Sequence, residues 1–279
     1  MDGENSKSPR MGRISFLNVL PIYYPLESGI IPHNYELVSA PPAILNDMMA
    51  RGELRVSSCS CIEYARHPGR YYLVPDLSIG SSGPVMSVLL MSSEPVTELD
   101  GGEILISGES HTSVALLRLL LKDYYKVSAN FKVGNVTAAL RSANPPTAFL
   151  AIGDEALRLR QRYSYRYDLA EIWREWTGEP FIFGLWVIDA ATADRDEFGE
   201  DPGAVLRAGR DWGMAHLDAI IDLTAYGCPL TKEELRIYYT RGLTYRLGKE
   251  ELAGLRLFYE KLAASGAIAA PPPLRFYGE

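Results

Sequence analysis

Residues 77–88 combine the groups of an anion-binding segment, because glycines and short hydroxyl side chains stand there between two apolar runs. Gly80 and Gly83 allow the backbone to turn, and serine hydroxyls offer donors beside backbone N–H groups. The serines are Ser78, Ser81, Ser82 and Ser87. Such groups could bind a carboxylate without any cationic side chain. By itself, a short Gly/Ser stretch is more typical of a solvated surface turn, so a binding role needs similar groups elsewhere in the chain.

Neutral polar groups do recur, at or near the ends of other expected elements. Asn18 follows an expected strand over residues 13–17, and Ser60 lies in an expected strand over 56–62. The segment 108–113 precedes an amphipathic run whose leucines repeat with the period of a helix. A hydroxyl cap there would leave the first N–H groups of that helix directed at an anion. The candidate ligand-contacting residues are Asn18, Ser60, Gly83, Ser87, Ser110, Thr112, Ser113, Gly153 and Asp154.

The elements that would position these residues begin with a β-α-β unit. A helix is expected over 41–51, where two prolines precede an apolar face and Gly52 follows it, and a short helix over 63–66 comes after the second strand. This order is the start of a parallel sheet with helices on its faces. Residues 1–12 are polar and charged, and we expect them to form a disordered tail.

Later elements predict a second lobe. Strands are expected over 85–91, 103–107, 148–152 and 181–188, and helices over 114–125, 136–143, 153–162, 201–223, 231–239 and 249–264. We expect the chain to cross between lobes near Val88 and again near Trp186. The first lobe would then hold residues 13–88 and 187–279, and the second residues 89–186. A ligand would bind in the cleft between these two α/β lobes, where loops at strand ends converge.

Charge and composition exclude several partner classes. The net charge of −7 and the pI near 5.3 argue against nucleic acid and against an anionic membrane surface. No apolar run approaches the roughly 20 residues that span a bilayer, and the first residues lack an apolar signal segment. We therefore expect a cytoplasmic protein whose partner is a small molecule.

Cysteine content and motif content predict no bound metal or cofactor. Three cysteines do not suggest a disulfide framework. Cys59 and Cys61 would share a strand face and could ligate a metal with His67, but buried cysteines in cytoplasmic proteins are usually small hydrophobic residues. The chain has no Gly-x-Gly-x-x-Gly, Walker, His-Glu-x-x-His or Gly-x-Ser-x-Gly motif.

Seven groups of residues, taken in order, resemble one known family. They are 13–18 with Pro21, 62–65, 77–80 with 83–88, Ser110 with Thr112 and Ser113, 152–154, 167–169, and 176–178 with Pro180 and Phe181. None is specific alone, but their order resembles the chorismate dehydratase family of the futalosine route to menaquinone. The resemblance extends over about residues 13–188 and weakly beyond.

The resemblance implies a type II periplasmic-binding-protein-like fold used as an enzyme. It implies conversion of chorismate to 3-[(1-carboxyvinyl)oxy]benzoate and water, without metal or redox cofactor, by a monomer or homodimer. Carried over to matching positions, Asn18, Ser60, Ser87, Thr112 and Ser113 surround the substrate. We expect Asn18 and Ser87 to be catalytic, holding the reacting end, and the other candidates to bind substrate.

The proton acceptor stays open at this point. His111, Glu109 and Asp154 are candidates, although Asp154 is also the residue type that caps a helix after a strand. The family's mechanism suggests a further candidate, the enolpyruvyl carboxylate of the substrate itself. Two other functions stay open as well: a non-catalytic small-acid-binding protein of the same fold, and the related 1,4-dihydroxy-6-naphthoate synthase, which cleaves a cyclised futalosine derivative.

Overall fold

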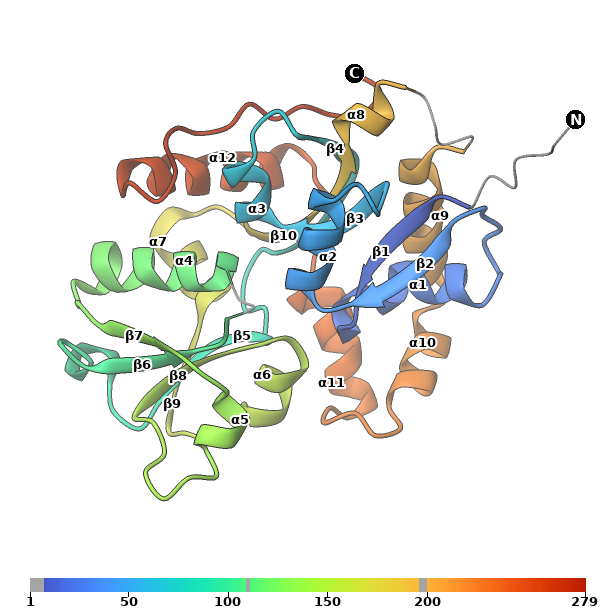
Figure 1. The fold of residues 1–279 in the computed structure, drawn as a ribbon. Helices are drawn as coiled ribbons and strands as arrows, with labels where there is room; N and C mark the ends of the chain where they lie inside the picture. Colours follow the sequence, from blue (N-terminus) through green and yellow to red (C-terminus); the bar gives the residue numbers. More distant parts are fainter. Residues whose placement is uncertain (1–7, 109–110, 196–199) are drawn as a thin grey trace, which may run out of the picture.

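The computed structural model describes residues 8–108, 111–195 and 200–279, which form two α/β lobes side by side (Figure 1). Each lobe is built on a five-stranded sheet, and helices cover the sheets. The expected two-lobe α/β architecture is therefore confirmed. Within these described ranges, no helix is both long enough and apolar enough to cross a bilayer.

The first lobe contains the sheet β2-β1-β3-β10-β4. Its strands are β1 (Arg10–Ile14), β2 (Glu36–Ala40), β3 (Val56–Ser60), β4 (Tyr71–Ser81) and β10 (Phe181–Asp189). β1 pairs in parallel with β2 and β3, as expected for a β-α-β unit. β10, the strand that returns from the second lobe, is inserted antiparallel between β3 and β4.

The second lobe repeats this strand order with its own elements. Its sheet is β7-β6-β8-β5-β9, formed by β5 (Val88–Ser92), β6 (Glu103–Ile106), β7 (Asn130–Val133), β8 (Ala148–Ile152) and β9 (Tyr165–Asp168). Here β5, the strand that has just left the first lobe, takes the inserted antiparallel place. Each lobe therefore contains one strand delivered by a crossing, and the residues at the crossings lie between the lobes.

Helices pack on both sheets. The first lobe has α1 (Leu20–Glu27), α2 (Pro42–Ala50), α3 (Cys61–Arg66), α8 (Ala190–Ala193), α9 (Pro202–Ala215), α10 (Leu217–Thr224), α11 (Lys232–Ile237) and α12 (Lys249–Ala264). The second has α4 (His111–Leu119), α5 (Val136–Ala139), α6 (Gly153–Leu159) and α7 (Leu169–Thr177). α4 lies between the second sheet and the first lobe, next to α3 and α12 (Figure 1). Single π-helical turns follow α4 (η3, Leu120–Tyr125) and α11 (η4, Tyr238–Gly242).

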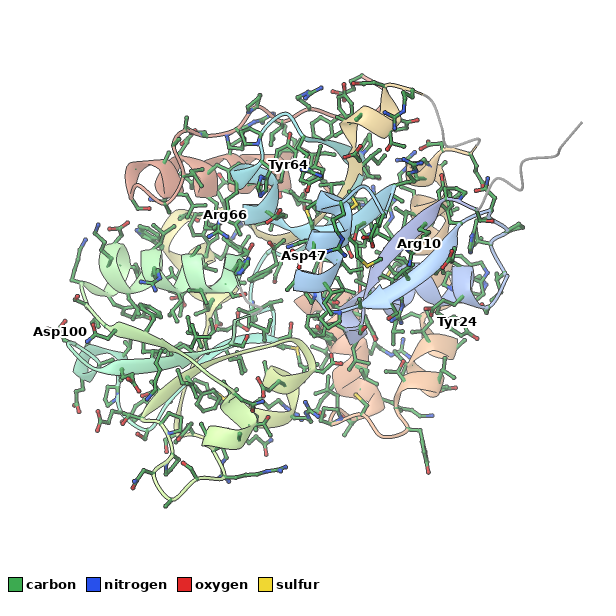
Figure 2. All side chains as sticks on the ribbon, in the orientation of Figure 1. Arg10, Tyr24, Asp47, Tyr64, Arg66 and Asp100 are labelled. Carbon is green, nitrogen blue, oxygen red and sulfur yellow. The ribbon has the colours of Figure 1, made fainter. Side chains whose placement is uncertain are left out.

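Two expected boundaries of the first lobe are wrong. The first strand begins at Arg10 (Figure 2) instead of Arg13. Met11 is fully buried, and the Arg10 guanidinium pairs with Glu36 of β2 at 3.5 Å. Residues 10–12 are therefore strand, and only residues 1–7 of the expected tail lie outside the described residues. The second crossing precedes Phe181, since Phe181 already pairs with Ser81 in the first sheet.

The Gly/Ser segment is shorter than expected. Residues 77–81 continue β4, and only 82–87 form the connection to β5. The hydroxyls of Ser78 and Ser81 donate to the carbonyls of Arg246 and Gly83, so these two side chains stabilise the strand end. Three expected helices are also shorter or divided: α5 and α6 end early, and the helix over 201–223 is interrupted at His216, whose ring stacks on Trp212.

Candidate functional site

A cavity of about 100 Å³ lies between the lobes and collects most of the expected site residues. Its walls are apolar, formed by Ile14, Phe16, Pro42, Cys59, Ile79, Val85, Val88, Ile152, Phe183, Gly184, Trp186 and Leu243. Its polar side chains are Asn18, Ser58, Ser60, Ser87, His111, Thr112 and Ser113, and Gly153 contributes backbone. None of the described residues lining it is Asp, Glu, Lys or Arg. A ligand in this cavity would meet neutral donors and apolar surface.

Ser87 stands at the end of the first crossing, where hydrogen bonds fix Ser87 and its neighbour Met86. Tyr238 donates its phenolic hydrogen to Ser87 Oγ at 3.1 Å, and the Gly153 N–H donates to the Ser87 carbonyl at 2.7 Å. The preceding residue, Met86, has φ of 65°, a left-handed conformation that is rare for a residue with a side chain. Its N–H donates to Asp168 Oδ2 at 2.7 Å, which stabilises that conformation. The orientation of Ser87 therefore depends on contacts from both lobes.

Asp168 connects this crossing to a helix of the second lobe. While Oδ2 accepts from Met86, Oδ1 accepts from the N–H groups of Ala170 and Glu171 and so caps α7. Burial raises the pKa of Asp168 to about 6, although these hydrogen bonds oppose the rise. The sequence does indicate the helix cap, because an Asp stands directly before an amphipathic helix. Nothing in the nearby sequence indicates the hydrogen bond from Met86 to Asp168.

Asn18 lies in the 3₁₀ turn η1 (Leu17–Val19), between β1 and α1. Tyr239 donates to the Leu17 carbonyl at 3.1 Å and Tyr245 donates to the Asn18 carbonyl at 2.9 Å. Asn18 Oδ1 and Ser60 Oγ are buried oxygens without a hydrogen-bond partner among the described residues. A buried polar atom without a partner costs stability unless a ligand or water satisfies it. Both residues line the cavity, so a ligand there could satisfy these oxygens.

Asp154 lies outside the cavity lining. Its Oδ1 accepts from the Leu17 N–H at 3.1 Å, a bond from the second lobe to the turn that carries Asn18, and burial raises its pKa. The adjacent Gly153 has φ of 54°, and a Cβ there would come within 3.2 Å of the Phe16 ring. The structure thus places Asp154 as a bridge between lobes and leaves the adjacent Gly153 in the lining.

Thr112 forms a second bridge between lobes. Its Oγ1 accepts from the Ile62 N–H at 3.2 Å and lies 3.5 Å from Cys61 Sγ. Thr112 or Ser113 was expected to cap α4, but both lie inside the helix, which begins at His111. With the Asp154 bond, this contact holds the two lobes together around the cavity.

Two expected site residues, Gly83 and Asp154, are not among the described residues that line the cavity. Gly83 lies in the crossing but does not line the cavity, and an added Cβ there would meet nothing within 4 Å. Ser110 lies outside the described residues, as does the possible proton acceptor Glu109. His111 does line the cavity, with an exposed side chain.

Ser58 and Trp186 line the cavity and were not predicted. Ser58 stands two residues before Ser60 in β3, and residues two apart share a face of a strand, so this spacing was a usable signal. Trp186 pairs with Ser58 in the neighbouring strand, and its indole N–H donates to Tyr23 Oη at 2.9 Å. Only the pairing of two strands far apart in sequence reveals the position of Trp186.

Cys59 and Cys61 are buried, and burial raises the pKa of both thiols, that of Cys61 to about 12. His67 is paired with Glu63 on α3 at 3.2 Å. Within the described parts of the chain, no three or more His, Cys, Asp or Glu side chains cluster as metal ligands would. The two cysteines pack as small apolar side chains in the wall of the first lobe.

Known proteins resemble this chain in sequence and in fold. A chorismate dehydratase from Thermus thermophilus is 27% identical over 271 residues, covering 90% of this chain and 94% of that protein. A chorismate dehydratase from Campylobacter jejuni is 28% identical over 177 residues, covering 62% of this chain and 64% of that protein. A solved Candida albicans protein with the generic periplasmic-binding-protein fold has a TM-score of 0.69 at 10% identity, covering 98% of each chain.

The fold comparison confirms the expected periplasmic-binding-protein-like architecture, with two α/β lobes and a cavity between them. A family model described as menaquinone biosynthesis matches residues 9–264, which include both sheets and every described residue that lines the cavity. The chain therefore belongs to the menaquinone biosynthesis family.

Proposed function

We propose that this protein is a hydro-lyase that eliminates water from chorismate to give 3-[(1-carboxyvinyl)oxy]benzoate. The observation that carries the proposal is the cavity itself, where Asn18, Ser60 and Ser87 stand among apolar walls and two of these side chains have unpartnered buried oxygens. The names of the two sequence relatives point to the same reaction. An aromatic ring with polar substituents matches such a lining.

The proposed reaction is balanced without a co-reactant. The ring carbon that bears the enolpyruvyl ether loses a proton, and its C–H electron pair forms a new ring π bond. The neighbouring carbon loses its hydroxyl with the C–O electron pair, and proton and hydroxide combine to water. Because the ring becomes aromatic and no net oxidation occurs, a redox cofactor is unnecessary. The protein has to orient the substrate, provide for the proton and stabilise the departing hydroxyl.

The lining supports a division of roles. We assign Asn18 and Ser87 to the reacting end, where an amide and a hydroxyl can hydrogen-bond the hydroxyl that leaves. We assign Ser60, Ser113 and the backbone around Gly153 to the carboxylates, since hydroxyl and N–H groups bind anions through charge-assisted bonds. Thr112 and Asp154 contribute by holding the lobes together through their bonds to Ile62 and Leu17.

The lining supports one choice of proton acceptor. Asp154 Oδ1 already accepts from Leu17, and no carboxylate stands among the described lining residues. Two titratable side chains line the cavity among the described residues: His111 is exposed, and Cys59 is a buried thiol whose pKa is raised by burial. We assign the proton to the enolpyruvyl carboxylate of the substrate, which is tethered through one vinyl carbon and the ether oxygen to the carbon that loses the proton.

Purified protein incubated with chorismate tests this function directly. We expect the ring to become aromatic, followed by ultraviolet absorption and NMR, in buffer treated with a chelator, and we expect the Ser87→Ala variant to be almost inactive. Chorismate that stays intact would refute the proposal, and tight binding of intact chorismate would assign a binding protein instead. Turnover of the cyclised futalosine derivative, with none of chorismate, would assign the naphthoate synthase reaction.

A further inference from the structure

A short segment near the C-terminal end of the first lobe contacts both proposed catalytic residues. It runs from the π-helical turn η4 at Tyr238 to Tyr245, and it is attached to the edge of β4. Gly80 and Thr244 exchange two backbone hydrogen bonds of 3.0 and 2.8 Å, and the Ser78 N–H donates to the Tyr245 carbonyl at 3.1 Å. The segment is therefore fixed to the strand that leads into the Ser87 crossing.

Tyr238 determines what the Ser87 hydroxyl can do. Tyr238 is fully buried, and burial raises its pKa, so its phenol stays protonated and acts as the donor to Ser87 Oγ. Once Ser87 Oγ accepts that hydrogen, the hydrogen of Ser87 itself is free for a ligand in the cavity that Ser87 lines. The contact thus presents Ser87 as a donor, which is the role that a departing hydroxyl or a carboxylate requires.

Tyr239 and Tyr245 act on the turn that carries Asn18. Their hydroxyls donate to two consecutive carbonyls, those of Leu17 and Asn18, while the Leu17 N–H donates to Asp154. Burial raises the pKa of both tyrosines, so they too stay protonated donors. Three hydrogen bonds therefore fix the backbone beside Asn18, whose side chain is left with an unpartnered buried oxygen.

We propose that Tyr238, Tyr239 and Tyr245 are positioning residues for the reaction, with Tyr238 directing the Ser87 hydroxyl as a donor and the other two fixing Asn18. The inference rests on the proposed function, because it concerns the same site. It assigns to residues 238–245 a role in turnover, carried by phenolic hydroxyls that do not have to touch the substrate.

The test is a double-mutant cycle on kcat, since Tyr238 should act only through Ser87. With Ser87 present, we expect Tyr238→Phe to lower kcat about tenfold, the value of one hydrogen bond, with KM changed less than about threefold. With Ser87→Ala, the same change should cost nothing further. Single-turnover measurements with excess enzyme extend the range to the slow variants. Tyr245→Phe in the Asn18→Ala background forms a second, independent cycle.

Tyr64→Phe is the matched control. Tyr64 is equally buried and lies on α3 at the top of the first lobe (Figure 2). Its hydroxyl donates to the Pro273 carbonyl at 2.8 Å, and Pro273 does not line the cavity, whereas the partner of Tyr238, Ser87, does. We expect Tyr64→Phe to keep the wild-type kcat even where it lowers the melting temperature as much as Tyr238→Phe does. Equal losses of kcat in both variants, additive losses in the cycles, or an unchanged kcat in Tyr238→Phe would overturn the inference. An inactive wild type would instead refute the proposed function.

Discussion

Asp168 predicts an unusual dependence of stability on pH. Its pKa is about 6 in the folded protein against the ordinary value of 3.8, a rise caused by burial. The folded state therefore binds this proton more tightly than the unfolded state does, and the contribution of Asp168 to stability is fully present below about pH 3.8 and lost as pH rises to about 6. Two pKa units at about 1.4 kcal/mol each give a loss of about 3 kcal/mol across that window.

The comparison that isolates this contribution uses Asp168→Asn. The amide cannot titrate, so the free energy of unfolding of the wild type minus that of the variant should fall by about 2 kcal/mol or more between pH 4 and pH 7. Urea unfolding at four or five pH values measures this difference, and other titrating groups cancel in it. Asp168→Asn should also lower kcat at every pH, because an amide cannot accept from Met86 and cap α7 equally well. A difference that stays flat, or that grows with pH, would show that the buried carboxyl does not titrate near 6.

Three further predictions concern turnover of chorismate. Ser87→Ala and Asn18→Ala should each lower kcat by about 100-fold or more, with melting temperatures near that of the wild type, as steady-state kinetics and calorimetry would show. Asp154→Ala removes the hydrogen bond from Leu17, so the lobes should close less tightly and KM should rise by about tenfold. An unchanged KM would show that this bond does not contribute to closure of the lobes. His111→Ala should keep kcat within about threefold if the substrate supplies its own base, and an inactive variant that still binds chorismate in calorimetry would make His111 the proton acceptor.

Local sequence signals predicted the elements that carry the site. Pro and Gly at the ends of an apolar face placed the helix Pro42–Ala50 within a residue of its bounds, and the apolar run at 181–188 is β10. The fold also brings together hydroxyl and amide residues from expected strand and helix ends, since Asn18, Ser60, Ser87 and Ser113 all line the cavity. The physical reason is that strand ends and helix starts expose N–H groups, so polar residues there face a common cleft.

The partners of those residues could not be predicted. Tyr238 and Ser87 are 151 residues apart, and Tyr245 and Asn18 are 227 residues apart, so no periodicity or capping pattern joins them. The hydrogen-bond partner of Asp154 could not be predicted either. Its position before an amphipathic helix indicates a cap or a ligand contact, and only the packing of the two lobes reveals that its carboxylate accepts from Leu17. Residue type gave the chemistry available at these positions, and tertiary structure decided where it is used.

The neutral lining of the cavity fits the proposed elimination better than a cationic one would. Chorismate and its product carry the same two carboxylates. An arginine bound to the ring carboxylate would stabilise substrate, transition state and product alike, which lowers KM without raising kcat and slows product release. Apart from the enolpyruvyl carboxylate, which takes the proton, the groups that change in the reaction are the hydroxyl that leaves and the ring that flattens. Ser87 and Asn18 can respond to the first and the apolar walls around Trp186 to the second. We therefore expect an arginine introduced at Ser60 to tighten binding of substrate and product together while kcat falls, and a rise in kcat would contradict this account of the site.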